Sequence, residues 1–150
     1  MEDHFDKRIG FILERTTRIT KLSFTKAFKK MNVDITPEQW VVIDALDKKG
    51  AMHQKDIGVQ SFKNAPTISR IIDNLVKKGF VERSTQNDDR RKTLIVLTEE
   101  GKNVVEKCTG EVAHIRELSW DGLSHEDYKQ FKNTIDSIFK NLSNYQKTDD

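Results

Sequence analysis

The middle of the chain constrains the fold most, because a strongly amphipathic helical pattern is followed at once by two short β-rich runs. Asn64 is a good N-cap, Pro66 suits a first helical turn, and Gly79 ends the helical pattern. Residues 80–84 and 92–97 are rich in β-branched and apolar residues and flank a polar, turn-rich stretch. The sequence therefore predicts a helix and then a two-stranded hairpin.

Helical patterns lie on both sides of this segment. Apolar residues at helical spacing predict one long helix over residues 5–31. Thr36 and Gln39 around Pro37 form a capping-box signal for a second helix, which Gly50 ends. A second helical region after the hairpin is expected to open at a capping threonine.

Three more helices complete the expected order: a short one over about 53–60, one capped by Thr98 that runs to about 118, and a last one from Ser124. The order predicts a mainly α chain with a small two- to three-stranded β wing. We expect a winged helix-turn-helix lobe, residues 37–98, within a single 1–150 chain. Helical dimerisation arms, residues 1–33 and 99–146, would flank this lobe.

The balance of residue types favours a homodimer. Hydrophobic residues make up 35% and charged residues 33%, which is poor in apolar residues for a lone globule but suits arms that share a core across subunits. In the last helix the apolar residues repeat at spacings of three and four, as at an interhelical seam. The residues expected at the dimer contact are Phe5, Ile9, Ile12, Phe131, Ile135, Ile138 and Leu142.

Several classes of function find no support in the sequence. The first residues lack a basic start with an apolar run, and no stretch approaches the ~20 apolar residues that cross a bilayer, so we expect a cytoplasmic protein without membrane contact. Cys108 is the single cysteine and lies on an apolar helical stripe, which favours a core role over a redox switch. We expect no metal, no cofactor and no enzymatic activity, because neither zinc-ligand spacing nor a nucleophile–base pair is present.

Positive charge is concentrated where a phosphate-binding surface would be needed. The whole chain carries +2, whereas residues 61–92 hold eight basic and four acidic residues, a net +4, which leaves −2 for the rest. The alternative is an ordinary solvated lysine-rich face.

The predicted helix over 64–78 would present its polar face to DNA. Its other face carries isoleucines, Leu75 and Val76. The candidate DNA-binding residues are Lys63, Asn64, Pro66, Thr67, Ser69, Arg70, Asn74 and Lys77. Arg70 is the strongest of them, because a guanidinium can bind guanine O6 and N7 together. The alternative for Arg70 is a surface ion pair with Asp73 or Asp56.

The hairpin tip supplies the remaining candidates, Asp89, Arg90, Arg91 and Lys92. A tip arginine could reach into the minor groove, whose negative potential attracts guanidinium. Phosphates would repel Asp89 if it pointed outward, so we expect it to hold Arg91 by an ion pair. The alternative is a charged, soluble β-turn without a DNA contact.

These segments together resemble the MarR (multiple antibiotic resistance regulator) family. The resemblance rests on residues 36–40, 66–75, 79–83, 89–92 and 97–101. Its most specific part is the Asp-x-Arg wing followed by Leu-Thr-x-x-Gly, and it spans roughly residues 5–142. It implies a homodimeric repressor or activator on palindromic double-stranded DNA, often released by small anionic or aromatic compounds.

The resemblance also implies an effector pocket, for which Phe11, Arg15 and Trp40 are the candidates. An aromatic ring beside a cation would suit a flat organic anion. The alternative is that Trp40 and Phe11 simply pack in the core and that Arg15 is solvated. The chain departs from many relatives at residues 51–53, Ala-Met-His, where a Ser or Thr cap is usual, so the short helix is capped weakly or by His53. It also lacks a cysteine in the first helix, which disfavours thiol-based sensing.

One alternative function stays open at this point. Winged helices also bind proteins through the same hairpin, and a fold does not fix a function. The chain could therefore be a protein–protein interaction module without an operator.

Overall fold

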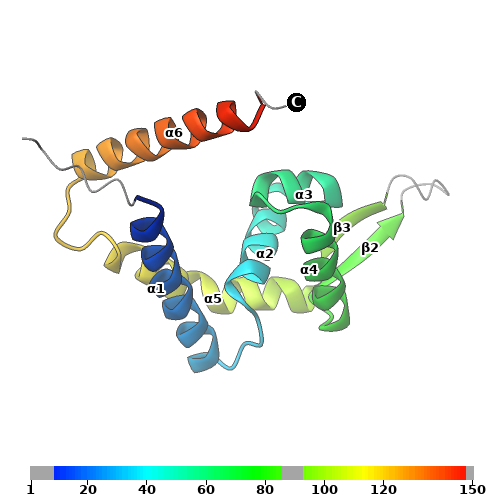
Figure 1. Cartoon of the computed structure of the whole chain (residues 1–150). Coiled ribbons are helices and arrows are strands. Elements are labelled where there is room, and N and C mark those ends of the chain that lie inside the picture. Colours follow the sequence, from blue (N-terminus) through cyan, green and yellow to red (C-terminus); the bar gives the residue numbers. More distant parts are fainter. Residues whose placement is uncertain (1–8, 86–92, 148–150) are drawn as a thin grey trace, which may run out of the picture. The chain divides into compact units, whose positions relative to one another are not determined.

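A computed structural model of the chain describes residues 9–85 and 93–147 (Figure 1). In chain order the elements are α1 (Ile9–Lys30), α2 (Pro37–Lys49), β1 (Met52–His53), α3 (Gln54–Ser61), α4 (Ala65–Lys77), β2 (Val81–Thr85), β3 (Thr93–Leu97), α5 (Glu99–Leu118) and α6 (His125–Lys147). The chain divides into two compact units, Met1–Val112 and Ala113–Asp150. The predicted fold class, mainly helical with a small β wing, is confirmed.

The second helix matches its prediction residue for residue, because its start and its end are both encoded locally. Thr36 Oγ1 accepts from the Gln39 backbone N–H at 3.2 Å, and Gln39 Oε1 accepts from the Thr36 N–H at 3.1 Å. These two bonds form the expected capping box. At the other end Gly50 has φ +78°, and its N–H donates to Leu46 O at 2.9 Å.

The wing has three strands, within the predicted range of two to three, although the sequence located only two of them. The antiparallel sheet has the order β1-β3-β2, with Met52 opposite Ile95 and Val81 opposite Leu97. β1 is only two residues long, too short for any alternating pattern to reveal. His53 stands at the N-cap of α3 without a side-chain capping bond, so the weakly capped alternative is the correct one.

The core of the first unit gathers around α4 and β3. Its side chains that are almost fully buried include Phe28, Val42, Ile43, Ile57, Ile68, Ile72, Leu75, Val81, Ile95, Cys108 and Val112. Cys108 is a core residue, as predicted, and burial raises the pKa of its thiol. A thiol with a raised pKa holds less of the reactive thiolate at neutral pH.

Ion pairs tie the neighbouring helices of this unit together. Lys21 of α1 lies 2.6 Å from Glu38 of α2, and this bond lowers the pKa of the Glu38 carboxyl. Lys78, at the end of α4, forms an ion pair with the Asp34 carboxylate at 3.2 Å and also donates to the Asp34 backbone oxygen at 2.7 Å and to Gln39 Oε1 at 3.3 Å. Both pairs are partly exposed, so they orient the helices more than they stabilise the fold.

The second unit, described by itself, consists of the end of α5 and the whole of α6. The Ser124 Oγ accepts from the Asp127 N–H at 3.1 Å while the Asp127 carboxylate accepts from the Ser124 N–H at 2.7 Å, as expected for the start of this helix. The Ser124 hydroxyl also donates to the Asp127 carboxylate at 2.7 Å, and this bond together with that from the Ser124 N–H lowers the pKa of Asp127. Trp120 packs edge-on against Tyr128 and Phe131 at ring distances of 4.9 and 5.8 Å. No residue of α6 is buried.

None of the helices in residues 9–85 and 93–147 is both long enough and apolar enough to span a membrane.

The hairpin and α5 meet at a very tight contact. Thr98 Oγ1 donates to Gly79 O at 2.6 Å and accepts from the Gly101 N–H at 3.0 Å, while the Thr98 N–H donates to Phe80 O at 3.1 Å. A Cβ atom at Gly101 would lie 2.1 Å from Phe80 O. Only glycine therefore allows α5 to start against the backbone that leaves α4.

Gly101→Ala should lower the free energy of unfolding by about 2 kcal/mol or more, because the clash is with backbone that cannot rotate away. Gly110→Ala is the matched control, since nothing lies within 4 Å of a Cβ there. It should raise stability by about 0.5–1 kcal/mol through helix propensity. Urea unfolding followed by circular dichroism measures both, and equal effects of the two changes would contradict the contact.

Candidate nucleic-acid interface

The two faces of α4 differ as the sequence predicted. Ile68, Ile71, Ile72 and Leu75 are buried, and Val76 is half-buried. The opposite face exposes Pro66, Arg70, Asp73, Asn74 and Lys77, while Thr67 and Ser69 are half-buried. The buried face fixes the rotation of α4 about its axis, so the polar face stays turned to solvent.

The start of α4 is organised by its cap. Asn64 Oδ1 accepts from the Thr67 backbone N–H at 2.9 Å, and Pro66 lies in the first turn. The side-chain oxygen of Asn64 is thus already hydrogen-bonded within the protein. Its role at an interface would be to hold the first turn in place, and only its amide group remains to donate to a ligand.

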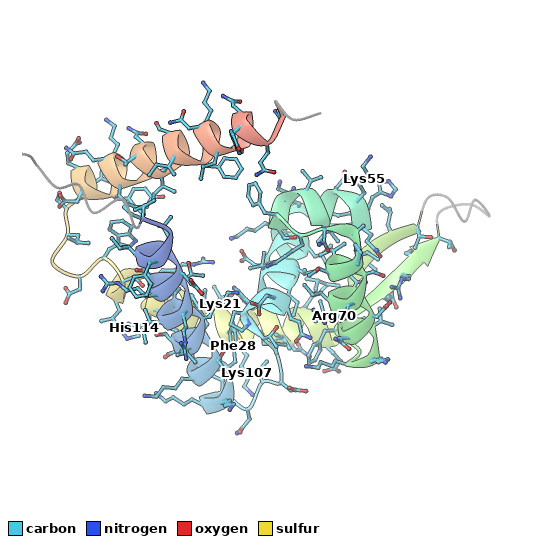
Figure 2. All side chains as sticks on the ribbon, viewed as in Figure 1. Lys21, Phe28, Lys55, Arg70, Lys107 and His114 are labelled. Carbon is cyan, nitrogen blue, oxygen red and sulfur yellow. The ribbon has the colours of Figure 1, made fainter. Side chains whose placement is uncertain are left out.

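Arg70 is exposed on α4 (Figure 2) and makes no ion pair or side-chain hydrogen bond with the residues that the structure describes. The alternative of a pair with Asp73 is wrong, because Arg83 of β2 binds the Asp73 carboxylate at 2.5 Å. No pair with Asp56 is formed either within this part of the chain. The Arg70 guanidinium is therefore available to an external acceptor.

The ion pair between Asp73 and Arg83 was missed by the sequence reasoning. It joins the exposed face of α4 to the first strand of the hairpin. The sequence signal for this pair was weak. Arg83 stands two positions after the buried Val81, and buried and exposed residues do not alternate regularly along β2, so the direction of the Arg83 side chain could not be predicted. The pair sets the base of the hairpin against α4. The predicted tip residues Asp89, Arg90, Arg91 and Lys92 lie outside the described residues.

The turn between α3 and α4 is compact and unusually apolar on its outside. A Cβ at Gly58 would lie 3.3 Å from Lys63 O and 3.5 Å from Ile68 Cγ2, so the two helices approach closely there. Phe62 ends α3 in the left-handed region, with φ +52° and ψ +40°. Beside it lies an open depression of about 700 Å³, lined by Gln54, Lys55, Gly58, Val59, Phe62, Lys63, Ala65 and Ile68.

The three candidates for an effector pocket are not brought together within the first unit. Trp40 is buried against Phe28, with ring centroids 5.9 Å apart, and its indole N–H has no hydrogen-bond partner in the described part of the chain. Phe11 and Arg15 are exposed on α1. They precede Phe28 by 17 and 13 residues, about 25 and 20 Å along the helix axis. Neither Phe11 nor Arg15, one of which was expected to form a wall with Trp40, is therefore beside it within one subunit.

The candidate dimer residues are largely accessible. Ile9, Phe131 and Leu142 are exposed, and Ile12, Ile135 and Ile138 are half-buried, whereas Phe5 lies outside the described residues. Within the described ranges, no group of three or more His, Cys, Asp or Glu side chains could hold a metal ion.

Comparisons with known proteins agree with this arrangement. The MarR family model matches residues 35–93. The chain is 32% identical over 108 residues to "Uncharacterized HTH-type transcriptional regulator YwoH" of Bacillus subtilis (strain 168), covering 69% of this chain and 78% of that protein.

Solved structures show the same fold. S. aureus MepR in complex with DNA has a TM-score of 0.80 at 23% identity, covering 88% of this chain and 96% of MepR. Bordetella bronchiseptica BpsR, described with regulation of its DNA binding by 6-hydroxynicotinic acid, has a TM-score of 0.74 at 24% identity, covering 93% and 96%. From the matched family model and the extent of the likeness to the B. subtilis regulator, we conclude that this chain belongs to the MarR family of winged helix-turn-helix, DNA-binding transcriptional regulators, which are not enzymes.

Proposed function

We propose that the chain is a repressor that binds a palindromic operator as a homodimer, with α4 in the major groove. The observation that carries this proposal is the exposed polar face of α4, where Arg70 has no ion pair among the described residues. A helix that enters the major groove reads bases with its N-terminal residues. Thr67, Ser69 and Arg70 occupy that part of α4.

The other predicted residues have supporting roles in this proposal. Lys63 and Lys77 bind phosphates near the two ends of α4, and Asn74 donates from its exposed face. Arg90, Arg91 and Lys92 of the hairpin tip contact the neighbouring minor groove, where Asp89 holds Arg91 in place. These contacts are sufficient for a repressor, because a repressor needs only to occupy an operator that overlaps a promoter.

The apolar surface of the arms supports a dimer. Phe131 and Leu142 of α6 are 52% and 62% exposed, and Ile19 and Leu22 of α1 are 60% and 53% exposed. Exposed apolar residues at helical spacing on two long helices favour a partner that covers them. A two-fold dimer presents its α4 helices to inverted half-sites, about one DNA turn apart.

A small organic acid is the effector class that we propose. The likeness to BpsR, with its 6-hydroxynicotinic acid, supports an aromatic anion. Trp40 retains a buried N–H without a partner in the described residues, and a bound acceptor or water would satisfy it. Phe11 and Arg15 lie several helical turns of α1 away from Phe28, the residue that packs against Trp40. They belong to such a site only if a second subunit brings them near.

Arg70→Ala should weaken binding to a selected operator by about 1–3 kcal/mol while leaving binding to random duplex almost unchanged, because base contacts carry the specificity. Lys77→Ala is the matched control on the same helix and should weaken both complexes about equally. Fluorescence anisotropy over a range of salt concentrations measures both, with a log–log slope near −0.9 per phosphate contact. Equal losses for Arg70→Ala on both duplexes would reassign Arg70 to a phosphate. Salt-independent binding would instead favour the protein-interaction module.

Ile135→Asp combined with Leu142→Asp should convert the dimer into a monomer, because two buried carboxylates would lack partners at the interface. Asn133→Asp combined with Asn141→Asp adds the same charge to exposed positions of α6 and should leave the dimer intact. Sedimentation velocity and operator affinity are measured together. A monomeric variant with wild-type affinity for the full operator would refute the dimer proposal.

Titration with salicylate-like acids should lower operator affinity and change tryptophan emission over one concentration range, because the ligand must bind the non-binding state more tightly. Trp120→Phe restricts the emission signal to Trp40. A saturable loss of operator affinity without any change in Trp40 emission would place the ligand elsewhere, and no response across a panel of aromatic acids would refute the effector class.

A further inference from the structure

Phe62, in the turn between α3 and α4, combines high exposure with a left-handed backbone. It is 80% exposed and adopts φ +52°, ψ +40°. Its backbone N–H donates to Val59 O at 3.3 Å, and the Lys63 N–H donates to Gly58 O at 3.0 Å. These bonds close the turn and hold Phe62 in the left-handed region.

Glycine or asparagine is the usual residue at such a helix end, because a side chain there clashes with the backbone in the left-handed conformation. Among the described non-glycine residues, only Asn32 shares this conformation, with φ +54°. A phenylalanine at this place is unfavourable twice, since its backbone is strained and most of its ring stays in water. Strained backbone of this kind clusters at functional sites.

The position of Phe62 suggests which function. It lies two residues before Asn64, the N-cap of α4, and so at the end of α4 that enters the major groove in the proposed complex. The depression beside it has apolar walls, formed by Val59, Ala65 and Ile68 together with Phe62. Val59 is itself 68% exposed.

The edge of this depression carries positive charge. Lys55 of α3, which Figure 2 labels, and Lys63 both line it. An apolar surface between two cations matches a DNA major groove that presents a methyl group between phosphates. Thymine is the base that supplies such a group, through its C5-methyl, and apolar side chains including phenylalanine contact it.

We propose that Phe62 is a specificity-determining residue that packs against a thymine methyl group in each half-site of the operator. Lys55 and Lys63 hold the flanking phosphates and place the ring over the groove. Val59 widens the apolar surface behind it. The inference rests on the proposed operator binding and adds to it an apolar contact that no polar residue of α4 provides.

The test replaces thymines by deoxyuridine in an operator that the wild-type dimer selects from a random pool, one position at a time. This change removes the methyl group and leaves base pairing unaltered. For the wild type we expect about a fourfold loss of affinity at one thymine of a half-site, the effect of leaving one methyl unburied. Phe62→Gly should bind the thymine and deoxyuridine operators equally well.

Phe62→Gly suits this test because glycine relieves the backbone strain, so its midpoint of urea unfolding should equal or exceed that of the wild type. Phe62→Asn tolerates the same conformation and should lose the methyl preference too. Asn32→Gly is the matched control, since it makes the same kind of backbone change outside the helix-turn-helix, and it should keep the fourfold discrimination.

Equal binding of the wild type to all thymine and deoxyuridine operators would overturn the inference while operator binding itself stands. Discrimination that persists in Phe62→Gly would also overturn it, by assigning the methyl contact to another residue. Failure of the wild type to select any sequence would overturn the proposed function, and this inference with it.

Discussion

Burial of one face of α4 is the constraint on which the rest of the structure depends. Ile68, Ile72 and Leu75 are at most 2% exposed, and they fix how α4 is rotated in the lobe. That rotation alone decides that Arg70, Asn74 and Lys77 point to solvent. The same packing brings β3 and α5 against α4 through Ile95 and Cys108. The polar face of α4 is therefore a consequence of its apolar face, and the proposed base-reading surface needs no further scaffold.

The sequence was sufficient to predict those features that depend on residues close together in the chain. The cap of α2 at Thr36 and that of α4 at Asn64 satisfy backbone donors within three residues, so their positions could be predicted from the residue types alone. The apolar face of α4 was equally predictable, because helical periodicity does not depend on the partner that covers it. The wing contacts, at Asp89 to Lys92, remain predictions.

Long-range contacts and strained backbone were beyond the sequence. β1 exists only because β3 offers it a partner, and two residues carry no period. The ion pair of Asp73 with Arg83 depends on how the hairpin leaves α4, which is set by the close contact at Gly101. The left-handed Phe62 could not be anticipated, since residue statistics favour glycine at such a position. For Trp40, the sequence indicated a core aromatic correctly but could not show how far it lies from Phe11.

The way α4 is held also limits how a ligand could act. Its start is fixed by the Asn64 cap and by the close approach at Gly58, and its end by Lys78, which binds the Asp34 backbone and Gln39. Its exposed face is joined to β2 by Asp73. Rotating α4 alone would break these contacts and expose the isoleucines behind it, at a cost of several kcal/mol. Moving the lobe as one rigid body breaks none of these contacts. In the proposed dimer, an effector would therefore act by changing the spacing of the two intact lobes, the hinge type of transition, and not by reshaping the surface that meets DNA.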